Sequence, residues 1–349
     1  LVMRVVFFCV CRRKGLVSSV VGGGGEIRSL FHDVASVANL FSAWKEFKRG
    51  KNKKEDVRAF EFNLENNLFR LHEDLILKTY EPDPYEGFFV HDPKKRHIHK
   101  ASVRDRVLHQ AIFRILYPIF DKHFIDHSYS SRIGKGTHKG VKNLYIAIRK
   151  ISNNWKSPVY TLKCDIRKFF DSIDHEILFG LIKGKVNDKD MLGLIGIILK
   201  SFEKEKGRGL PLGNVTSQLF ANIYLDELDQ FVKHKLKVKY YFRYADDFVI
   251  LDESKECLGK LKDEIERFLS EKMKLKLHEN KVFIKKVSQG IDFLGYVILP
   301  GATVLRTTTK RRMFKKANSI NLPSYEGVLS HCRARKISSD LQKIAKIGF

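Results

Sequence analysis

Lys239-Tyr240-Tyr241-Phe242-Arg243-Tyr244-Ala245-Asp246-Asp247-Phe248-Val249-Ile250-Leu251 is the stretch that decides the fold. Aromatic residues at 240, 242 and 244 alternate with 241 and 243, which is the period of a β-strand, and residues 248–251 predict a second strand. We expect a hairpin with Asp246 and Asp247 at its tip, because Asp tolerates turn dihedrals. Adjacent carboxylates repel each other, so a bound cation would stabilise them. A solvated acidic turn is the alternative for the pair taken alone.

Composition indicates a folded, strongly basic protein. The chain has 349 residues, of which 43% are hydrophobic and 30% charged, enough for roughly two or three packed units. The formal net charge is +25, from 65 Lys and Arg against 40 Asp and Glu. A surplus of this size favours a polyanionic partner, most simply nucleic acid, although a merely basic protein is the alternative.

The cysteines and the hydropathy exclude several classes of protein. The five cysteines are scattered and form no CxxC pair or His/Cys ligand set, which argues against structural zinc and a disulfide framework. This usage suits a reducing cytosol, and no apolar run is long enough to span a bilayer. Gly22 to Gly25 predicts a flexible linker. We expect the ordered protein to begin near Leu30 and assign no function to residues 1–29.

The first half of the chain predicts helices around a short hairpin. Apolar spacing predicts an amphipathic helix over residues 56–80 and another over 103–120. Between them, residues 88–100 predict two strands joined by a basic turn, either a solvated tip or a cationic clamp on phosphates. His97 and His99 share a strand face, but with no third ligand nearby surface histidines are favoured. The Gly- and Ser-rich residues 129–137 predict a loop without the order of a phosphate-binding P-loop.

The second half predicts strands that carry the remaining acidic residues. Residues 158–165 predict a strand buried on one side, with Asp165 on its open face, followed by a helix capped by Asp174. A Gly- and Pro-rich loop over 207–213 precedes a helix through residues 221–231 that Asn214, Thr216 or Ser217 can cap. Further apolar patterns predict a helix over 258–269, strands over 275–277, 282–284 and 291–299, and a basic helical tail from Arg306.

This order of elements predicts an α+β core in which Asp165 and Asp246, both at strand ends, could meet. Two Mg²⁺ ions about 3.5–4 Å apart, bridged by such carboxylates, are the usual apparatus for in-line phosphoryl transfer. Magnesium prefers hard oxygen ligands and keeps several waters, so few protein ligands suffice.

Four stretches resemble, in order, the motifs of reverse transcriptases. Asp165-Ile166-Arg167-Lys168-Phe169-Phe170-Asp171-Ser172-Ile173-Asp174 resembles their first metal-binding box, and Gly209-Leu210-Pro211-Leu212-Gly213-Asn214-Val215-Thr216-Ser217-Gln218 resembles their template-and-nucleotide loop. Tyr244-Ala245-Asp246-Asp247 resembles their YxDD box, and Phe293-Leu294-Gly295-Tyr296 resembles the late FLG box of bacterial members. The resemblance runs from about residue 30 to about residue 315.

The resemblance implies a right-hand polymerase. Its fingers and palm would be an antiparallel sheet with helices on one face, and its thumb would be short and helical. The implied boundaries are residues 1–29 unassigned, 30–157 N-terminal helices and fingers, 158–300 palm with an insert around 185–215, and 301–349 a short basic thumb.

The resemblance also assigns roles to single residues. Asp165, Asp246 and Asp247 would hold two Mg²⁺ ions, for which Mn²⁺ can substitute, to activate the primer 3′-hydroxyl and neutralise the triphosphate. Lys94 and Arg96 would clamp the incoming deoxynucleoside triphosphate, since Arg suits bidentate phosphate contact.

Two further residues have equally plain structural alternatives. Phe170 would be a steric gate against the ribose 2′-hydroxyl, whereas ordinary core packing is its alternative. Lys281 would protonate the pyrophosphate leaving group, whereas a solvated surface lysine is its alternative.

The nucleotide loop departs from the common pattern. Many reverse transcriptases carry Gln-Gly and then Ser-Pro, where this chain has Leu212-Gly213 and Ser217-Gln218. This variant resembles the enzymes of diversity-generating retroelements, which copy an RNA template with errors at adenines. We hypothesise that Leu212 and Gln218 contribute to low fidelity, since Leu212 removes an amide near the nascent pair.

Other functions remain open at this stage. A group II intron or retron-type reverse transcriptase is the nearest alternative, and the end of the chain soon after a short thumb disfavours the intron type. A non-catalytic RNA-binding protein would lack a metal ligand, whereas all three Asp are present. An RNA-copying RNA polymerase is a third option. The resemblance implies template RNA, primer, deoxynucleoside triphosphates and an accessory protein as partners, in the cytoplasm of a bacterium or archaeon or encoded by a phage.

Overall fold

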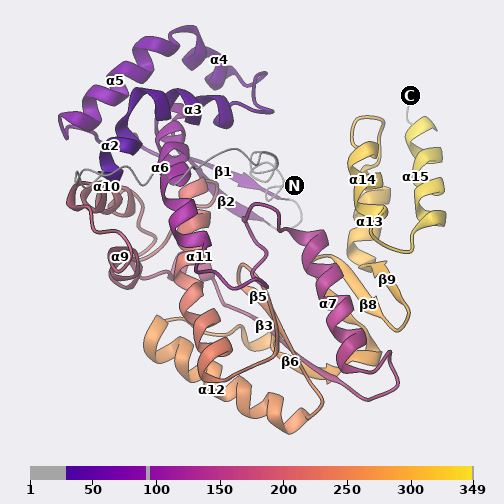
Figure 1. The fold of residues 1–349 in the computed structure, drawn as a ribbon. Coiled ribbons are helices and arrows are strands. Elements are labelled where there is room, and N and C mark those ends of the chain that lie inside the picture. The colour runs from indigo at the N-terminus through magenta and orange to yellow at the C-terminus, as the bar shows by residue number, and fades with distance from the viewer. Residues whose placement is uncertain (1–28, 92–94, 348–349) are drawn as a thin grey trace, which may run out of the picture.

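The computed structural model describes residues 29–91 and 95–347 and shows an α+β protein (Figure 1). A four-stranded antiparallel sheet lies at its centre in the order β4-β5-β3-β6. Its strands are β3 (Tyr160–Asp165), β4 (Tyr240–Tyr244), β5 (Asp247–Asp252) and β6 (Phe283–Lys286). The predicted hairpin is β4–β5, in which Tyr244 pairs with Asp247 and only Ala245 and Asp246 lie between the strands.

Both faces of the central sheet are covered. Alternate residues of β3, β4 and β5 pack on one face in a core that includes α11 (Val215–Gln230) and α12 (Lys255–Met273). The other face packs against α7 (Thr137–Ile151) and a second sheet. Thr161 and Lys163 are therefore buried, and the expectation of an open face on β3 is wrong. The apolar stripe of α7, to which the sequence reading assigned no helix, supplies part of this cover.

The N-terminal helices pack around one long helix. They are α2 (Leu30–Ala35), α3 (Val37–Phe47), α4 (Glu55–Phe62) and α5 (Leu64–Ile76), and the long helix is α6 (Val103–Asp121). The single helix predicted over residues 56–80 is two helices, because Asn63 has a φ of −122° and interrupts the helical backbone. The predicted hairpin follows as β1 (Glu86–Val90) and β2 (Arg96–Lys100). Its turn, with Lys94, lies outside the described residues.

Short helices separate β3 from α11. Asp174 accepts hydrogen bonds from the amides of Glu176 and Ile177 and caps α9, as predicted. The segment runs through α8 (Phe169–Ser172), α9 (His175–Lys183) and α10 (Lys189–Lys200).

The C-terminal part forms a small sheet and three helices. The strand predicted over residues 291–299 is a hairpin, because Leu294 and Gly295 both have positive φ (53° and 88°) and reverse the chain. The strand predicted over 275–277 is an isolated bridge between Ile166 and Leu277. The elements are β7 (Ile291–Phe293), β8 (Tyr296–Leu299), β9 (Ala302–Leu305), α13 (Thr307–Lys316), α14 (Leu322–Leu329) and α15 (Arg335–Ile347). The basic tail is thus helical, and Figure 1 shows these helices on the opposite side of the molecule from α3–α5.

Two sequence expectations can be followed in the described residues. Cys164, Cys257 and Cys332 are free thiols, and Cys9 and Cys11 lie outside the described part of the chain. Over residues 29–91 and 95–347, no helix combines the length and apolarity that a bilayer span requires.

Candidate active site

Three carboxylates lie at the same end of neighbouring strands. Asp165 is opposite Asp247 in the register of β3 and β5, and the Ile166 amide donates to the carbonyl of Asp246 at 3.2 Å. Burial raises the pKa of Asp246, and the charge of Asp165 raises it further. Burial likewise raises the pKa of Asp247 to about 6, with smaller contributions from Asp246 and Asp165. The structure therefore brings together the acidic residues that are 81 positions apart in the chain (246 minus 165).

Two lysines pair with these carboxylates. Lys281 Nζ lies 2.6 Å from Asp165 Oδ1, and Lys163 Nζ lies 3.2 Å from Asp247 Oδ2. Asp247 Oδ1 is buried and receives no hydrogen bond from any described residue. Such an oxygen is costly unless a donor or a cation satisfies it.

The donor set suits a hard divalent cation. The three carboxylates, one of which has a buried oxygen without a hydrogen-bond partner, provide the oxygen ligands that Mg²⁺ prefers. As they stand, no three His, Cys, Asp or Glu side chains of the described residues are grouped to hold a metal ion. Lys281 would have to release Asp165 for an ion to bind, so the site requires a side-chain rearrangement.

A buried arginine holds the turn that carries Asp246. Arg243 is fully buried, and its Nε and Nη2 donate to the two carboxylate oxygens of Asp229 at 2.7 and 2.6 Å. Its Nη1 donates to the Ala245 carbonyl at 3.3 Å. Ala245 has a φ of 52°, a left-handed conformation that costs a non-glycine residue about 1–2 kcal/mol. The arginine therefore stabilises a strained turn next to Asp246.

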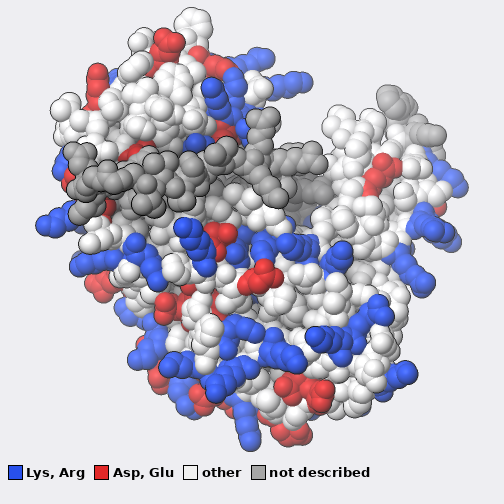
Figure 2. Space-filling model, viewed as in Figure 1, with Lys and Arg blue, Asp and Glu red and all other residues white. Residues whose placement is uncertain are grey.

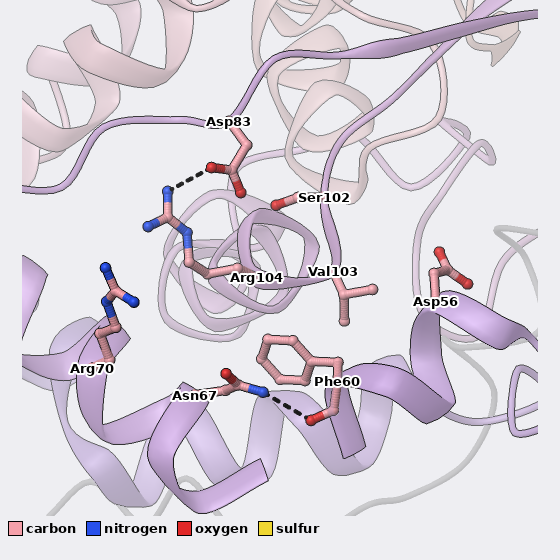
Figure 3. A pocket seen from close by; sticks show the side chains of 8 residues that line it. All are labelled: Asp56, Phe60, Asn67, Arg70, Asp83, Ser102, Val103 and Arg104. Carbon is pink, nitrogen blue, oxygen red and sulfur yellow. Dashed lines mark hydrogen bonds and ion pairs between the residues drawn. The ribbon is translucent and has the colours of Figure 1, made fainter. Parts of the chain in front are cut away.

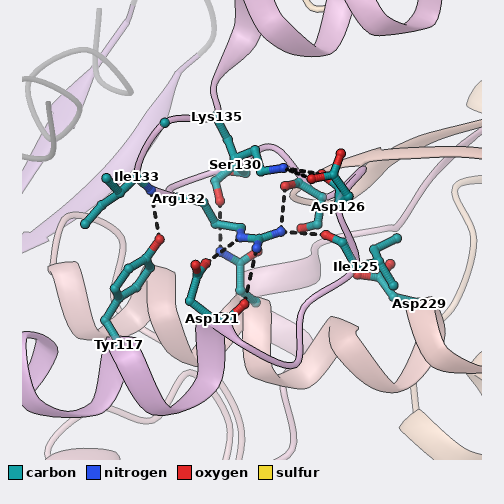
Figure 4. A network of polar contacts seen from close by, with 12 residues as sticks. Tyr117, Asp121, Ile125, Asp126, Ser130, Arg132, Ile133, Lys135 and Asp229 are labelled. Carbon is teal, nitrogen blue, oxygen red and sulfur yellow. Dashed lines mark hydrogen bonds and ion pairs between the residues drawn. The ribbon is translucent and has the colours of Figure 1, made fainter. Parts of the chain in front are cut away.

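The same network reaches the loop that was predicted over residues 129–137. Asn222 accepts from Arg243 at 3.3 Å and donates to the Ser130 carbonyl at 2.9 Å. Within the loop, Arg132 donates to Asp121 Oδ1 and to the Ile125 carbonyl, both at 2.6 Å. Figure 4 shows these contacts converging on the Arg132 guanidinium from the end of α6. The loop is therefore fixed against both α6 and β4.

Six of the predicted site residues line one cavity of about 270 Å³. They are Arg96, Phe170, Leu212, Gly213, Gln218 and Asp246. The remaining lining residues are Ile98, Ser130, Ser131, Lys168, Phe169, Asp171, Ala221, Asn222 and Ala245. This volume is near the lower end of small-molecule pockets, which span about 300–1,000 Å³. Lys94 lies outside the described residues. Asp165 and Asp247 are not among the lining residues but adjoin Asp246, which is, and Lys281 contacts Asp165.

The two phenylalanines after Asp165 occupy different environments. Phe169 is buried in the core, whereas Phe170 is only partly buried, and their rings meet edge to face at 5.5 Å. The Phe170 carbonyl accepts the Leu210 amide at 2.8 Å, which joins the first acidic box to the nucleotide loop. Both rings line the cavity, and Phe170, the more exposed of the two, also packs against the edge of the core.

A second cavity, of about 430 Å³, lies among the N-terminal helices (Figure 3). Its charged residues are already paired for the most part: Arg104 contacts Asp83, and Asp56 contacts Arg106. None of the predicted site residues lines it. The chemistry of the three carboxylates therefore belongs to the smaller cavity. Figure 2 shows Lys and Arg side chains spread over the central and C-terminal parts of the surface in view.

Comparison with known proteins identifies the family. The model of the family described as reverse transcriptase (RNA-dependent DNA polymerase) matches residues 90–298, more than half of the chain. The chain belongs to the reverse transcriptase family. The match covers the first acidic box, the nucleotide loop, the YxDD box and the FLG box, so the resemblance found in the sequence is confirmed at the level of the family.

Relatives with known names include intron proteins. The group II intron-encoded protein LtrA of Lactococcus lactis subsp. cremoris is 28% identical over 329 residues, which cover 74% of this chain and 53% of LtrA. Protein YkfC of Escherichia coli is 23% identical over 269 residues, covering 66% of this chain and 70% of YkfC. This reverse transcriptase chain spans about half the length of LtrA.

Solved structures with a similar fold include apo telomerase from Candida tropicalis, truncated from its C-terminal domain. Its TM-score is 0.48 at 13% identity, over 67% of this chain and 58% of that one. A partial Cas6-RT-Cas1–Cas2 complex has a TM-score of 0.41 at 18% identity, over 74% of this chain and 46% of that one.

The sequence reading missed several residues of the site. Lys163 and Arg243 contact the acidic turn, and Asn222 and Lys168 line the cavity. A signal existed for the first two, because each is a cation placed within an apolar strand, where an unpaired charge is costly. Asn222 and Lys168 carry no such signal, because the burial of Asn222 within α11 and the left-handed backbone of Lys168 are visible only in the structure.

Proposed function

We propose that this chain is an RNA-directed DNA polymerase that uses Mg²⁺, or Mn²⁺ in its place, to copy an RNA template into DNA. The observation that carries the proposal is the position of Asp246. Its backbone is hydrogen-bonded beside Asp165, and it lines the cavity that Arg96, Phe170 and Leu212 also line. The acid that would bind a metal ion thus also lines the cavity in which a nucleotide would bind, and the family match supports the same chemistry.

Each residue of the site has a defined task under this proposal. Asp165, Asp246 and Asp247 would hold the ions, which when bound lower the pKa of the primer 3′-hydroxyl and neutralise the triphosphate. Arg96 would bind the triphosphate, and its charge partly opposes the rise in the pKa of Asp246 that burial causes. Lys281 would release Asp165 and become free to protonate the leaving pyrophosphate.

The Phe170 ring would exclude the ribose 2′-hydroxyl from the cavity. This role is supported by the partial exposure of Phe170 in the cavity wall, whereas Phe169 beside it is almost fully buried. A smaller side chain at position 170 would leave space for the hydroxyl and relax the choice of sugar.

Primer extension tests the proposed activity. The purified chain, given a primed RNA template and Mg²⁺, is expected to incorporate deoxynucleotides and to require the divalent ion. Phe170→Ala is expected to raise ribonucleotide incorporation relative to the parent protein. If the protein binds the primed template but no divalent ion supports extension, the RNA-binding alternative is favoured. Equal use of ribonucleotides by the parent would favour an RNA polymerase and remove the gate role from Phe170.

We further propose that copying is error-prone, as in a diversity-generating retroelement. Leu212 and Gln218, the two departures from the common loop, both line the nucleotide cavity, which supports an effect on base selection. Leu212→Gln is expected to lower misincorporation opposite template adenine, with errors opposite the other bases as the control. An unchanged error spectrum would contradict the idea. The similarity to LtrA is also compatible with the group II intron type, and accurate copying by the parent protein would support that alternative.

The domain boundaries and cellular context are further proposals. Residues 30–157 would form the N-terminal helices and fingers, 158–300 the palm with an insert around 185–215, and 301–349 the thumb. Template RNA, primer and deoxynucleoside triphosphates would be the partners, with an accessory protein in a retroelement. The charge of +25 supports the nucleic-acid partners, and the scattered cysteines support a cytoplasmic location.

A further inference from the structure

The hairpin β7–β8, which contains the FLG motif, makes a direct connection to the acidic site. Lys163, on β3, is largely buried, and its Nζ lies 2.6 Å from the backbone carbonyl of Asp292 on β7. The same Nζ lies 3.2 Å from Asp247 Oδ2. One ammonium group therefore joins a carboxylate of the active site to a backbone atom of the hairpin.

The side chain of Asp292 is bound by Arg306, the residue at the N-cap position of α13. Arg306 precedes α13, and its Nε donates to Asp292 Oδ1 at 2.8 Å, with its Nη2 on the same oxygen. The Arg306 amide also donates to the Gly295 carbonyl at 3.0 Å, in the turn of the hairpin. The hairpin is thus fixed to the start of α13 by a side chain and by the backbone.

The turn end of the hairpin also contacts α14 and α7. Tyr296 donates its hydroxyl hydrogen to the Val328 carbonyl on α14 at 2.9 Å. A Cβ on Gly140 of α7 would lie 3.4 Å from the Leu294 side chain, so the hairpin turn packs closely on α7. A displacement of α13 and α14 would therefore move β7, and with it the carbonyl that Lys163 contacts.

We propose that Lys163 is a positioning residue that couples the C-terminal helices to the orientation of the Asp247 carboxylate, through Asp292 and Arg306. The proposal rests on the proposed polymerase function, under which these helices would move when the primed template binds. A buried ammonium has three N–H donors and needs several acceptors, so Lys163 keeps its position only while Asp247 and the Asp292 carbonyl are both within reach. The carbonyl of Asp292 restricts the ammonium to one position, and the carboxylate must align with it because the pair is poorly exposed to water.

Kinetics of single variants and of their combination test the coupling. Lys163→Met removes the link at the site, and Arg306→Ala removes it at α13. At saturating primed template and nucleotide, each is expected to reduce the single-turnover rate about 10-fold or more, and the double variant is expected to be no slower than Lys163→Met. Lys286→Met on the exposed side of β6 and Arg311→Ala on the exposed side of α13 serve as charge-matched controls, expected to stay within about 2-fold of the parent.

Two kinetic results would overturn the proposal. The first is an Arg306→Ala variant that weakens affinity for the primed template but keeps the saturated rate, since this is what a purely structural role at α13 would do. The second is additivity of the two substitutions, since independent sites add.

Hydrogen exchange gives a test that requires no catalysis. In Arg306→Ala, the amides of residues 244–249 are expected to exchange about 5-fold faster or more than in Arg311→Ala, because the site loses one of its anchors. Unchanged exchange there would overturn the coupling even if Lys163→Met fails to fold. A parent protein that extends no primer would contradict the proposed function, and this exchange measurement would still decide the link.

Discussion

The two hairpins that meet at the smaller cavity are built in opposite ways. The β4–β5 hairpin carries Asp246 and has both faces of its strands buried, whereas the β1–β2 hairpin carries Arg96 and exposes most of β1. Phe88 and Phe89 on β1 are 42% and 54% exposed. Strand pairing is antiparallel in both, so the difference arises from what covers them.

Their anchors differ accordingly. The β4–β5 hairpin is held by the fully buried ion pair between Arg243 on β4 and Asp229 on α11. The β1–β2 hairpin is held by aromatic contacts: the Phe89 ring stacks on the His97 ring at 4.6 Å, and the His99 ring contacts the Phe202 ring at 4.6 Å. Carboxylates that hold a metal ion would need fixed positions, whereas a cation that contacts a mobile triphosphate would not. The comparison predicts that substitutions in the β4–β5 hairpin affect catalysis and stability strongly. Substitutions in the β1–β2 hairpin should affect mainly substrate binding.

The largest effect is expected at the tip of the buried hairpin. Asp246→Asn should reduce primer extension by on the order of 10³-fold, because one carboxylate at the reacting centre loses its charge. The melting temperature should stay near that of the parent, since burial and repulsion already raise the pKa of this group. Asp252→Asn, at the far end of β5, is the matched control. Activity within 10-fold of the parent would remove Asp246 from the metal site.

The next effect concerns stability beneath the same hairpin. Arg243→Met should lower the free energy of unfolding by about 3–5 kcal/mol, because it leaves the Asp229 carboxylate buried without its partner. Glu86→Gln, which removes an exposed ion pair with Lys100 in the other hairpin, should cost less than about 1 kcal/mol. Denaturant unfolding of both variants checks the contrast, and similar losses in the two would contradict it.

A third effect is a pH dependence of stability that arises on α11, which packs against the β4–β5 hairpin in the core. Burial on α11 raises the pKa of Asp226 to about 6. A carboxyl with a raised folded pKa holds its proton more tightly in the folded state, so its contribution to stability falls as the pH rises between about 4 and about 6. Asp226→Asn should therefore be more stable than the parent at pH 7, by up to about 3 kcal/mol. The gain should vanish below about pH 4, and equal stability at pH 7 would refute the burial argument.

The smallest effect is expected in the exposed hairpin. Arg96→Ala should raise the KM for the incoming nucleotide about 10-fold, with a smaller change in kcat, because Arg96 lies in the cavity wall and its hairpin is not part of the core. The KM of Arg96→Lys should lie between the KM of the parent and that of Arg96→Ala, because lysine keeps the charge but not the bidentate geometry. The free energy of unfolding should change by less than about 0.5 kcal/mol. A loss of kcat alone would mean that Arg96 acts on the reaction and not on binding.

Strong local patterns were enough to predict much of this architecture. The alternation in residues 240–251 and the Asp pair predicted the hairpin, and the apolar spacing predicted α6, α9, α11 and α12. Predictions failed where one backbone angle interrupts a pattern, as at Asn63 and at Leu294 with Gly295. They also failed for β3, where alternation alone could not show that Lys163 faces a second layer.

The sequence by itself determined which residues form the hairpin and that Asp165, Asp246 and Asp247 stand at strand ends, because strand period and turn preference act over a few neighbouring residues. Only the tertiary structure decided that the ammonium groups of Lys163 and Lys281 contact those carboxylates, and that Arg96, Phe170 and Leu212 line one cavity. These contacts join residues far apart in the chain, so they depend on how the two layers pack against the central sheet.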